Sequence, residues 1–243
     1  MAEHQNLREI ETAGPCAFGA AKSERVQMIH LYTWRTPNGR KIPIMLEEIG
    51  VAYAVHPIDI SKNEQFASDF LRIAPNNKIP AIIDDHIVDT TADGGAFAIF
   101  ESGAILIYLA ETSGRLLAPS RPARFKALEW LHWSIGGLGP MLGQLGFFAV
   151  RAEDKAALAI DRFTQEADRL LGVVERRLSD APYLAGDDYS IADIACYPWL
   201  VAATTALKEP LAKSLQDKPA LHRWLATVGS RPAVVKGMRV PPE

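Results

Sequence analysis

Cysteine is scarce in this sequence. Among 243 residues there are two cysteines, Cys16 and Cys196, one in a polar leading segment and one in an apolar helical pattern. Two cysteines so placed do not form the cross-linked framework of a small secreted protein. We therefore expect a reducing compartment and a fold that is stabilised by its hydrophobic core.

Long apolar runs and clustered positive charge are also missing. The longest apolar stretch, residues 191–207, is shorter than the roughly 20 residues of a transmembrane helix, and residues 1–26 lack the apolar core of a secretory signal. Twenty-nine acidic and 26 basic residues give a net charge of −3, without the basic cluster that nucleic-acid binding requires. The six histidines show no metal-binding spacing. We expect a cytoplasmic protein with no metal and with no nucleic-acid or membrane partner.

The pattern of apolar residues divides the chain in two. Upstream of residue 116, alternating and helical periods predict strands over 27–34, 53–58, 81–84 and 98–100, and helices over 39–49, 64–72 and 102–111. This order, βαβαββα, is typical of a thioredoxin-like domain. Downstream, helical spacing recurs over 124–145, 155–178, 191–207 and 221–228.

The predicted fold class is therefore α/β plus all-α. We expect an N-terminal extension over 1–26, a thioredoxin-like domain over 27–115, a linker over 116–122 that carries Ala-Pro-Ser-Arg-Pro, and an all-helical domain with a C-terminal tail over 123–243.

The first motif, Thr36-Pro37-Asn38-Gly39, lies where a strand ends and a helix begins. A threonine hydroxyl can cap free N–H groups there, and proline suits the first helical position. The unpaired N–H donors and the positive end of the helix dipole would stabilise a thiolate. Taken alone, the same four residues also make an ordinary turn and helix start.

Two further motifs follow. Asn77-Lys78-Ile79-Pro80 precedes an apolar strand, where proline either blunts a sheet edge or holds a cis peptide. Glu101-Ser102 begins a helix, where a hydroxyl can cap the helix, the N-terminus can receive a carboxylate and the glutamate can pair with an ammonium group. Each motif alone has an ordinary structural explanation.

Together, in this order, the three motifs resemble the glutathione site of the glutathione transferase superfamily, and most of all its nu class, which includes disulfide-bond oxidoreductases. The likeness runs from about Met28 to Pro232. It implies that the first domain binds glutathione as a cosubstrate. Nine residues would contact or position it: Thr36 and Asn38 at the sulfur, Gln65 and Lys78 at the glycyl end, Ile79 with the cis residue Pro80 at the cysteinyl backbone, Glu101 and Ser102 at the γ-glutamyl end, and Arg162 from the helical domain. Arg162 is equally explained as a solvated helix charge.

The resemblance implies an enzyme, active as a homodimer, that reduces small disulfides and has glutathione transferase activity. Because the first motif carries no cysteine, the reacting sulfur would come from glutathione. Several alternatives remain open: conjugation to an electrophile, cleavage of an ether or thioether, peroxide reduction, a non-catalytic glutathione-binding regulator, and an interaction protein without a ligand.

Four features of the sequence bear on the rest of the fold. Ser190 and Asp193 have the spacing of a helix-capping arrangement, the glycine-rich segment 136–143 is expected to loosen or kink a helix that faces the cleft, and Pro43 is expected to kink the first helix. Tyr32 is interpreted as structural. Five aromatic side chains could line a pocket for the second substrate, although this spacing is more typical of core residues: Trp130, His132, Trp133, Phe147 and Phe148.

Overall fold

The computed structural model describes residues 28–88 and 96–242. Four strands form one mixed sheet, in the order β2-β1-β3-β4. The strands are β1 (Ile29–Thr33), β2 (Tyr53–Pro57), β3 (Ala81–Val88) and β4 (Ala96–Phe100). β1 runs parallel to β2 and antiparallel to β3, and β3 pairs antiparallel with β4. The predicted thioredoxin-like order of strands and helices is confirmed.

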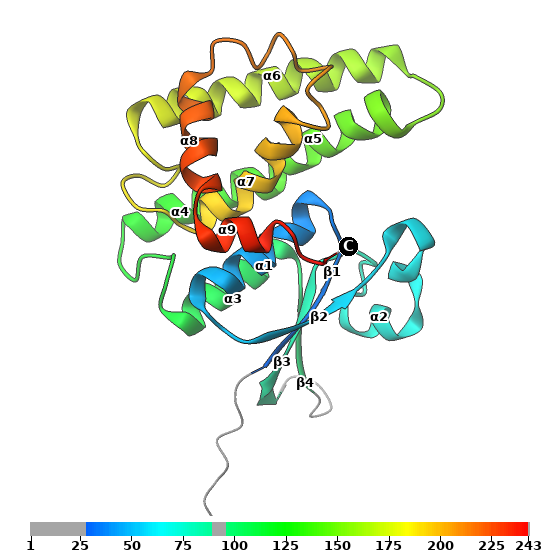
Figure 1. Ribbon diagram of the computed structural model, residues 1–243, viewed down its shortest axis with the longest axis vertical. Coiled ribbons are helices and arrows are strands. Elements are labelled where there is room, and N and C mark those ends of the chain that lie inside the picture. The colour runs from blue at the N-terminus through cyan, green and yellow to red at the C-terminus, as the bar shows by residue number, and fades with distance from the viewer. Residues whose placement is uncertain (1–27, 89–95, 243) are drawn as a thin grey trace, which may run out of the picture.

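Three helices cover this sheet: α1 (Pro37–Ile49), α2 (Ser68–Ile73) and α3 (Ser102–Ser113). Figure 1 shows α1 and α3 between the sheet and the helical part of the chain, with α2 apart from them. Phe70 of α2 belongs to a small hydrophobic cluster with Ala74 and Ala81, separate from the main core. The single helix predicted over 64–72 is instead a 3₁₀ turn, Glu64–Phe66, followed by α2, because Ala67 between them is extended.

Helices make up the second part, as predicted. They are α4 (Ala123–Trp133), α5 (Gly139–Leu145), α6 (Ala157–Asp180), α7 (Ile191–Thr204), α8 (Pro219–Gly229) and α9 (Pro232–Gly237). Two π-helical segments, Ser134–Leu138 and Gly146–Arg151, lie before and after α5. The glycine-rich segment therefore widens the helix locally, which agrees with the expectation of a loosened helix. The capping arrangement at the start of α7 is also confirmed.

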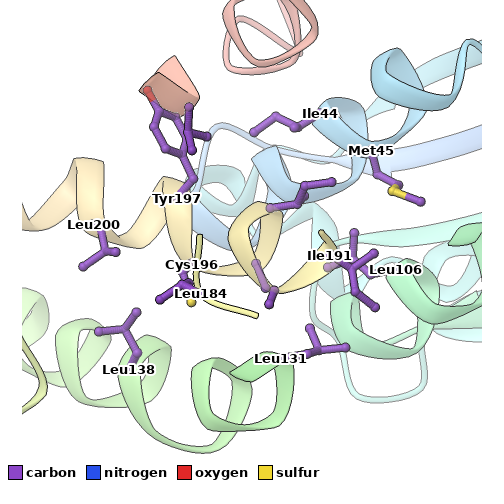
Figure 2. Close-up of a cluster of buried hydrophobic side chains, with 14 of the residues drawn as sticks. Ile44, Met45, Leu106, Leu131, Leu138, Leu184, Ile191, Cys196, Tyr197 and Leu200 are labelled. Carbon is purple, nitrogen blue, oxygen red and sulfur yellow. The ribbon is translucent and has the colours of Figure 1, made fainter. Parts of the chain in front are cut away.

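The two parts share one hydrophobic core. Side chains from α1 and α3, such as Met45 and Leu106, are buried with Ile191 and Leu200 of α7 and with Leu131 of α4. Figure 2 shows these side chains converging around α7, which lies between α1 and α4. Because burial of apolar surface dominates folding free energy, this shared core fixes α1 against the helical part.

α9 was not predicted, although its proline at the first turn is a recognisable start signal. In Figure 1 this last helix, in red, crosses α1, in blue. A Cβ added to Gly237 would lie 2.5 Å from the Ile44 backbone nitrogen, so the two backbones approach closely. Arg231 donates to both carboxylate oxygens of Glu48, at 2.6 and 2.8 Å, and stabilises the same contact. The C-terminal end of the chain thus supports α1.

α1 runs unbroken through Pro43. Proline at this position cannot donate to the carbonyl four residues earlier, that of Gly39. The Thr33 hydroxyl, at the end of β1, donates to that carbonyl at 2.9 Å, and Thr33 is fully buried. The side chain of the preceding strand therefore replaces the hydrogen bond that Pro43 removes.

We expect Thr33→Val to lower the free energy of unfolding by about 1–3 kcal/mol, because it leaves the buried Gly39 carbonyl without a donor. Urea unfolding of the variant measures this loss. Thr33→Ser keeps the hydroxyl and is the matched control, with a smaller loss. Equal losses in both variants would show that the methyl group matters, and not the hydrogen bond.

Among the residues that the structure describes, no helix is both long and apolar enough to cross a membrane. The same ranges contain no group of three or more His, Cys, Asp or Glu side chains suited to hold a metal ion.

Candidate functional site

The N-terminus of α1 has the geometry expected from the first motif. Thr36 is the extended N-cap residue, and its Oγ1 accepts a hydrogen bond from the Gly39 backbone N–H at 3.1 Å. Pro37 opens the helix. A hydroxyl that accepts one hydrogen bond still has its own proton to donate. Thr36 can therefore cap the helix and donate to an anion at the same time.

Gly39 is required by the backbone at this turn. A Cβ at this position would lie 2.0 Å from the Trp34 carbonyl oxygen. The first turn of α1 thus packs directly onto the end of the preceding strand. This packing places the start of α1 against a cleft, which Thr36, Pro37 and Asn38 line.

The cleft lies between the two parts of the chain and has a volume of about 470 Å³. Its first wall is largely polar and comes from the thioredoxin-like part: Thr36, Pro37, Asn38, Ile60, Gln65, Asn77, Lys78 and Ile79. Its second wall is largely apolar and comes from the helical part: Leu142, Gly143, Gly146, Arg151, Trp199, Ala202, Ala206 and Leu207. Such a cleft can hold a polar peptide beside an apolar group.

Five of the predicted site residues meet in this cleft, namely Thr36, Asn38, Gln65, Lys78 and Ile79. The Ile79–Pro80 peptide bond is cis, and Pro80 itself is buried. The structure therefore brings together the residues expected at the sulfur, at the glycyl end and at the cysteinyl backbone of a glutathione molecule.

Gln65 has an unused acceptor. Its Oε1 atom is buried and has no hydrogen-bond partner among the described residues. Buried polar atoms nearly always have a partner in a folded protein. Because Gln65 lines the cleft, an N–H group of a bound ligand would satisfy this oxygen.

Asn38 has a partner that the sequence did not indicate. The Trp199 indole Nε1–H, from α7, donates to Asn38 Oδ1 at 2.9 Å. Because the indole only donates, this bond fixes which end of the amide faces Trp199, and it leaves the Nδ2 hydrogens free to donate elsewhere. Trp199 is thus a part of the site that connects the helical part to the first motif.

Two glycines make room for Trp199. A Cβ at Gly139 would lie 2.9 Å from the Trp199 Nε1 atom, and one at Gly143 would lie 3.4 Å from its ring. The indole therefore lies against the backbone of the widened helix. The glycine-rich segment allows this packing. Its glycines are therefore the signal in the sequence that could have indicated a large side chain packed against this helix.

Glu101 and Ser102 lie at the start of α3, outside the residues that line the cleft. Glu101 is the N-cap residue, but no side-chain hydrogen bond caps the helix. The Ser102 hydroxyl, expected to cap, instead accepts a hydrogen bond from the Lys41 ammonium at 3.3 Å. The reason is positional, because Ser102 is the first helical residue and its buried side chain points to α1.

Arg162 lies on α6 and also stands outside the cleft lining. Its side chain is 66% exposed and pairs with Glu166 at 3.9 Å, one helical turn away. In this chain alone, Arg162 has the surroundings of a solvated helix charge, which was its alternative interpretation.

The five candidate aromatic side chains are absent from the described cleft lining, where Trp199 is the aromatic member. Four of them contact one another in pairs, while His132 is exposed and its Nδ1 lies 2.7 Å from the Leu128 carbonyl oxygen. The rings of Trp130 and Trp133 meet edge to face, as do those of Phe147 and Phe148. Their alternative interpretation, packing rather than substrate binding, fits these contacts better.

Cys196 is a free cysteine in α7 and is fully buried. Burial raises the pKa of its thiol to about 12, which keeps it protonated at neutral pH. Cys16 lies outside the described residues. Within the described part of the chain, the reactive sulfur of a redox reaction therefore has to come from a ligand.

Family models match both parts of the chain. Residues 27–111 match the model of the glutathione S-transferase N-terminal domain, and residues 157–227 match that of the C-terminal domain. Two similar proteins come from Escherichia coli strain K12. The disulfide-bond oxidoreductase YfcG is 47% identical over 85% of this chain and 92% of its own length, and the disulfide-bond oxidoreductase YghU is 39% identical over 86% and 73%.

Solved structures have the same fold. A glutathione transferase family member from Pseudomonas fluorescens, with two glutathione molecules bound, is 42% identical with a TM-score of 0.82 and covers 88% of this chain and 93% of its own. A glutathione transferase from Pseudomonas putida, with one glutathione disulfide bound per subunit, is 40% identical with a TM-score of 0.82, covering 88% and 92%.

Proposed function

The chain belongs to the glutathione S-transferase superfamily, and from this premise we propose that it is a glutathione-dependent enzyme that reduces small disulfides without a protein cysteine. One observation carries this proposal. Thr36 and Asn38 present hydrogen-bond donors at a helix start that opens into the cleft, while Cys196 is buried and held as a thiol.

The reaction proceeds by two thiol–disulfide exchanges. A glutathione thiolate attacks one sulfur of the substrate, forming a mixed disulfide and releasing the other half as a thiolate. A second glutathione thiolate attacks the mixed disulfide at the glutathione sulfur and releases the remaining half. The products are oxidised glutathione and two substrate thiols, which take up the two protons lost by the glutathione thiols.

The protein contributes alignment and stabilisation of the thiolate. The Thr36 hydroxyl, the Asn38 side-chain amide and the Asn38 backbone N–H act as donors to the sulfur, because Gly39 and Arg40 already donate to Thr36 and Pro37 has no N–H. Gln65 and Lys78 bind the glycyl end, and Ile79 binds the cysteinyl backbone. The relatives that hold two glutathiones or one glutathione disulfide support a site of this size.

Conjugation of glutathione to an electrophile is the second candidate. The apolar wall of the cleft favours it, because Leu142, Trp199 and Leu207 would bury an apolar acceptor.

We also propose a cytoplasmic homodimer. Its support is the family resemblance together with exposed phenylalanines, since Phe66 and Phe125 are 55% and 52% exposed on this single chain. Light scattering at several protein concentrations tests the mass of the assembly.

The proposed reaction predicts that cysteine is dispensable. Reduction of 2-hydroxyethyl disulfide should persist, within about twofold, in a Cys16→Ser/Cys196→Ala variant, because neither sulfur takes part in the exchanges. A chlorodinitrobenzene assay in parallel measures conjugation. Loss of reduction in this variant, at unchanged melting temperature, would contradict the proposal, and conjugation without reduction would favour the second candidate.

A further inference from the structure

Lys41 is a buried ammonium that the reaction does not use. It lies in the second turn of α1 and is 1% exposed. Its hydrogen-bond partner among the described residues is the Ser102 hydroxyl, and it forms no ion pair with a described carboxylate. Burial of a charge without a counter-ion is strongly unfavourable. Glu101 acts on Lys41 electrostatically but forms no direct ion pair with it, so an anion beside Ser102 would further stabilise the buried charge.

The geometry of the contact defines what Ser102 can do. An ammonium group has hydrogens but no lone pair, so Ser102 Oγ must be the acceptor in the 3.3 Å contact with Lys41 Nζ. The serine proton therefore points away from Lys41. Because no side chain caps α3, the free N–H groups of its first turn lie beside this hydroxyl. A donor hydroxyl, unpaired N–H groups and a positive charge behind them together suit a carboxylate.

We propose that Lys41 is a positioning residue for the α-carboxylate of the γ-glutamyl group of glutathione, acting through the Ser102 hydroxyl. This inference rests on the proposed function, which places the γ-glutamyl group at Glu101 and Ser102. Glu101 then meets the ammonium group of the ligand, so that opposite charges on ligand and protein face each other. The bound carboxylate adds a second negative charge on the Ser102 side of Lys41.

The same arrangement makes binding sensitive to pH. Burial lowers the pKa of Lys41 to about 8, and the titratable groups that face it are Glu101, from the turn before α3, and Cys196, from α7. Cys196 stays neutral over this range, because burial raises its own pKa to about 12. Above pH 8 Lys41 loses its charge, so affinity for the carboxylate falls as the pH rises.

The test compares the wild type with Lys41→Met, which keeps the length of the side chain and removes its charge. Titration calorimetry with S-methylglutathione avoids titration of the ligand thiol. We expect the variant to bind about 10- to 100-fold more weakly at pH 7, as for loss of a charged hydrogen bond. Its decline in affinity above pH 8 should be smaller than that of the wild type, because only the ligand ammonium facing Glu101 then loses a proton.

The melting temperature of Lys41→Met should rise, although its affinity for S-methylglutathione falls. Removal of a buried charge from the ligand-free protein should raise its melting temperature by about 5 °C. A purely structural lysine would instead lower the melting temperature when it is replaced. Weaker binding in a more stable protein is therefore the result that only the positioning role predicts.

Two controls make the test specific. A glutathione analogue whose γ-glutamyl group lacks the α-carboxylate should bind wild type and Lys41→Met equally. Ser102→Ala should weaken binding of S-methylglutathione, and the addition of Lys41→Met to it should have little further effect, because both act on one carboxylate.

Each outcome has one meaning. Equal affinity of wild type and Lys41→Met for S-methylglutathione, or fully additive losses with Ser102→Ala, would overturn the inference and leave the proposed function intact. Failure of the wild type itself to bind would instead overturn the proposed function.

Discussion

Replacement of Thr36 and Asn38 together with alanine should lower kcat for glutathione-dependent disulfide reduction by about 100-fold or more. In the proposed mechanism each residue donates to the glutathione sulfur, Thr36 from the N-cap of α1 and Asn38 from its first turn. Removal of a single preorganised donor to a developing anion typically costs about 10²–10³-fold. The pKa of the bound thiol should rise, which ultraviolet absorbance of the thiolate measures against pH.

Trp199→Phe is the matched variant for this experiment. It keeps a ring against Gly139 and Gly143 but removes the N–H that donates to Asn38 Oδ1. The amide of Asn38 could then rotate. We therefore expect kcat for disulfide reduction to fall about tenfold, with glutathione still bound. A variant with wild-type turnover would show that Asn38 needs no such support. Unchanged turnover and thiol pKa in the Thr36/Asn38 double variant would refute the mechanism itself.

Asp193→Ala should lower the free energy of unfolding by about 3–5 kcal/mol. Asp193 is fully buried, and its Oδ1 accepts from the Leu184 backbone N–H at 3.0 Å and from Trp224 Nε1 at 2.9 Å. Its Oδ2 accepts from the Ser190 backbone N–H at 3.0 Å and from the Ser190 hydroxyl at 3.3 Å. Alanine leaves these donors buried and unpaired, and the urea unfolding midpoint reports the cost.

Asp193→Asn keeps the shape of the side chain and removes its charge, so it shows how much of the loss is due to the charge. The amide oxygen can still accept from Leu184 and Trp224, while the NH₂ group faces the Ser190 donors. We expect a loss smaller than that of alanine. If the alanine variant unfolded at the wild-type urea concentration, the capping network would have no role in stability.

Local signals in the sequence predict most of the fold. Thr36 with Pro37, and Ser190 with Asp193, are helix starts whose partners lie within three residues, and both are confirmed. The order of strands follows from apolar alternation and turn residues. The break at Ala67 was missed because neither proline nor glycine marks it.

Contacts between residues far apart in the sequence could not be predicted from local patterns. Trp199 and Asn38 are 161 residues apart, and Lys41 and Ser102 are 61 apart. Each of these residues has an ordinary local explanation on its helix. The role of each residue depends on a second helix packed beside its own. The pattern of residues along the sequence does not indicate which two helices pack together.

The packing of α9 on α1 has a consequence for how the protein is made. α1 begins at residue 37 and leaves the ribosome well before Gly237, which lies against its backbone. α1, which opens onto the cleft, therefore lacks this neighbour until every other described helix has been synthesised. A polypeptide that ended before residue 232 would keep every residue expected to contact glutathione. It would lack α9, which packs against α1, the helix whose N-terminal end carries Thr36 and Asn38.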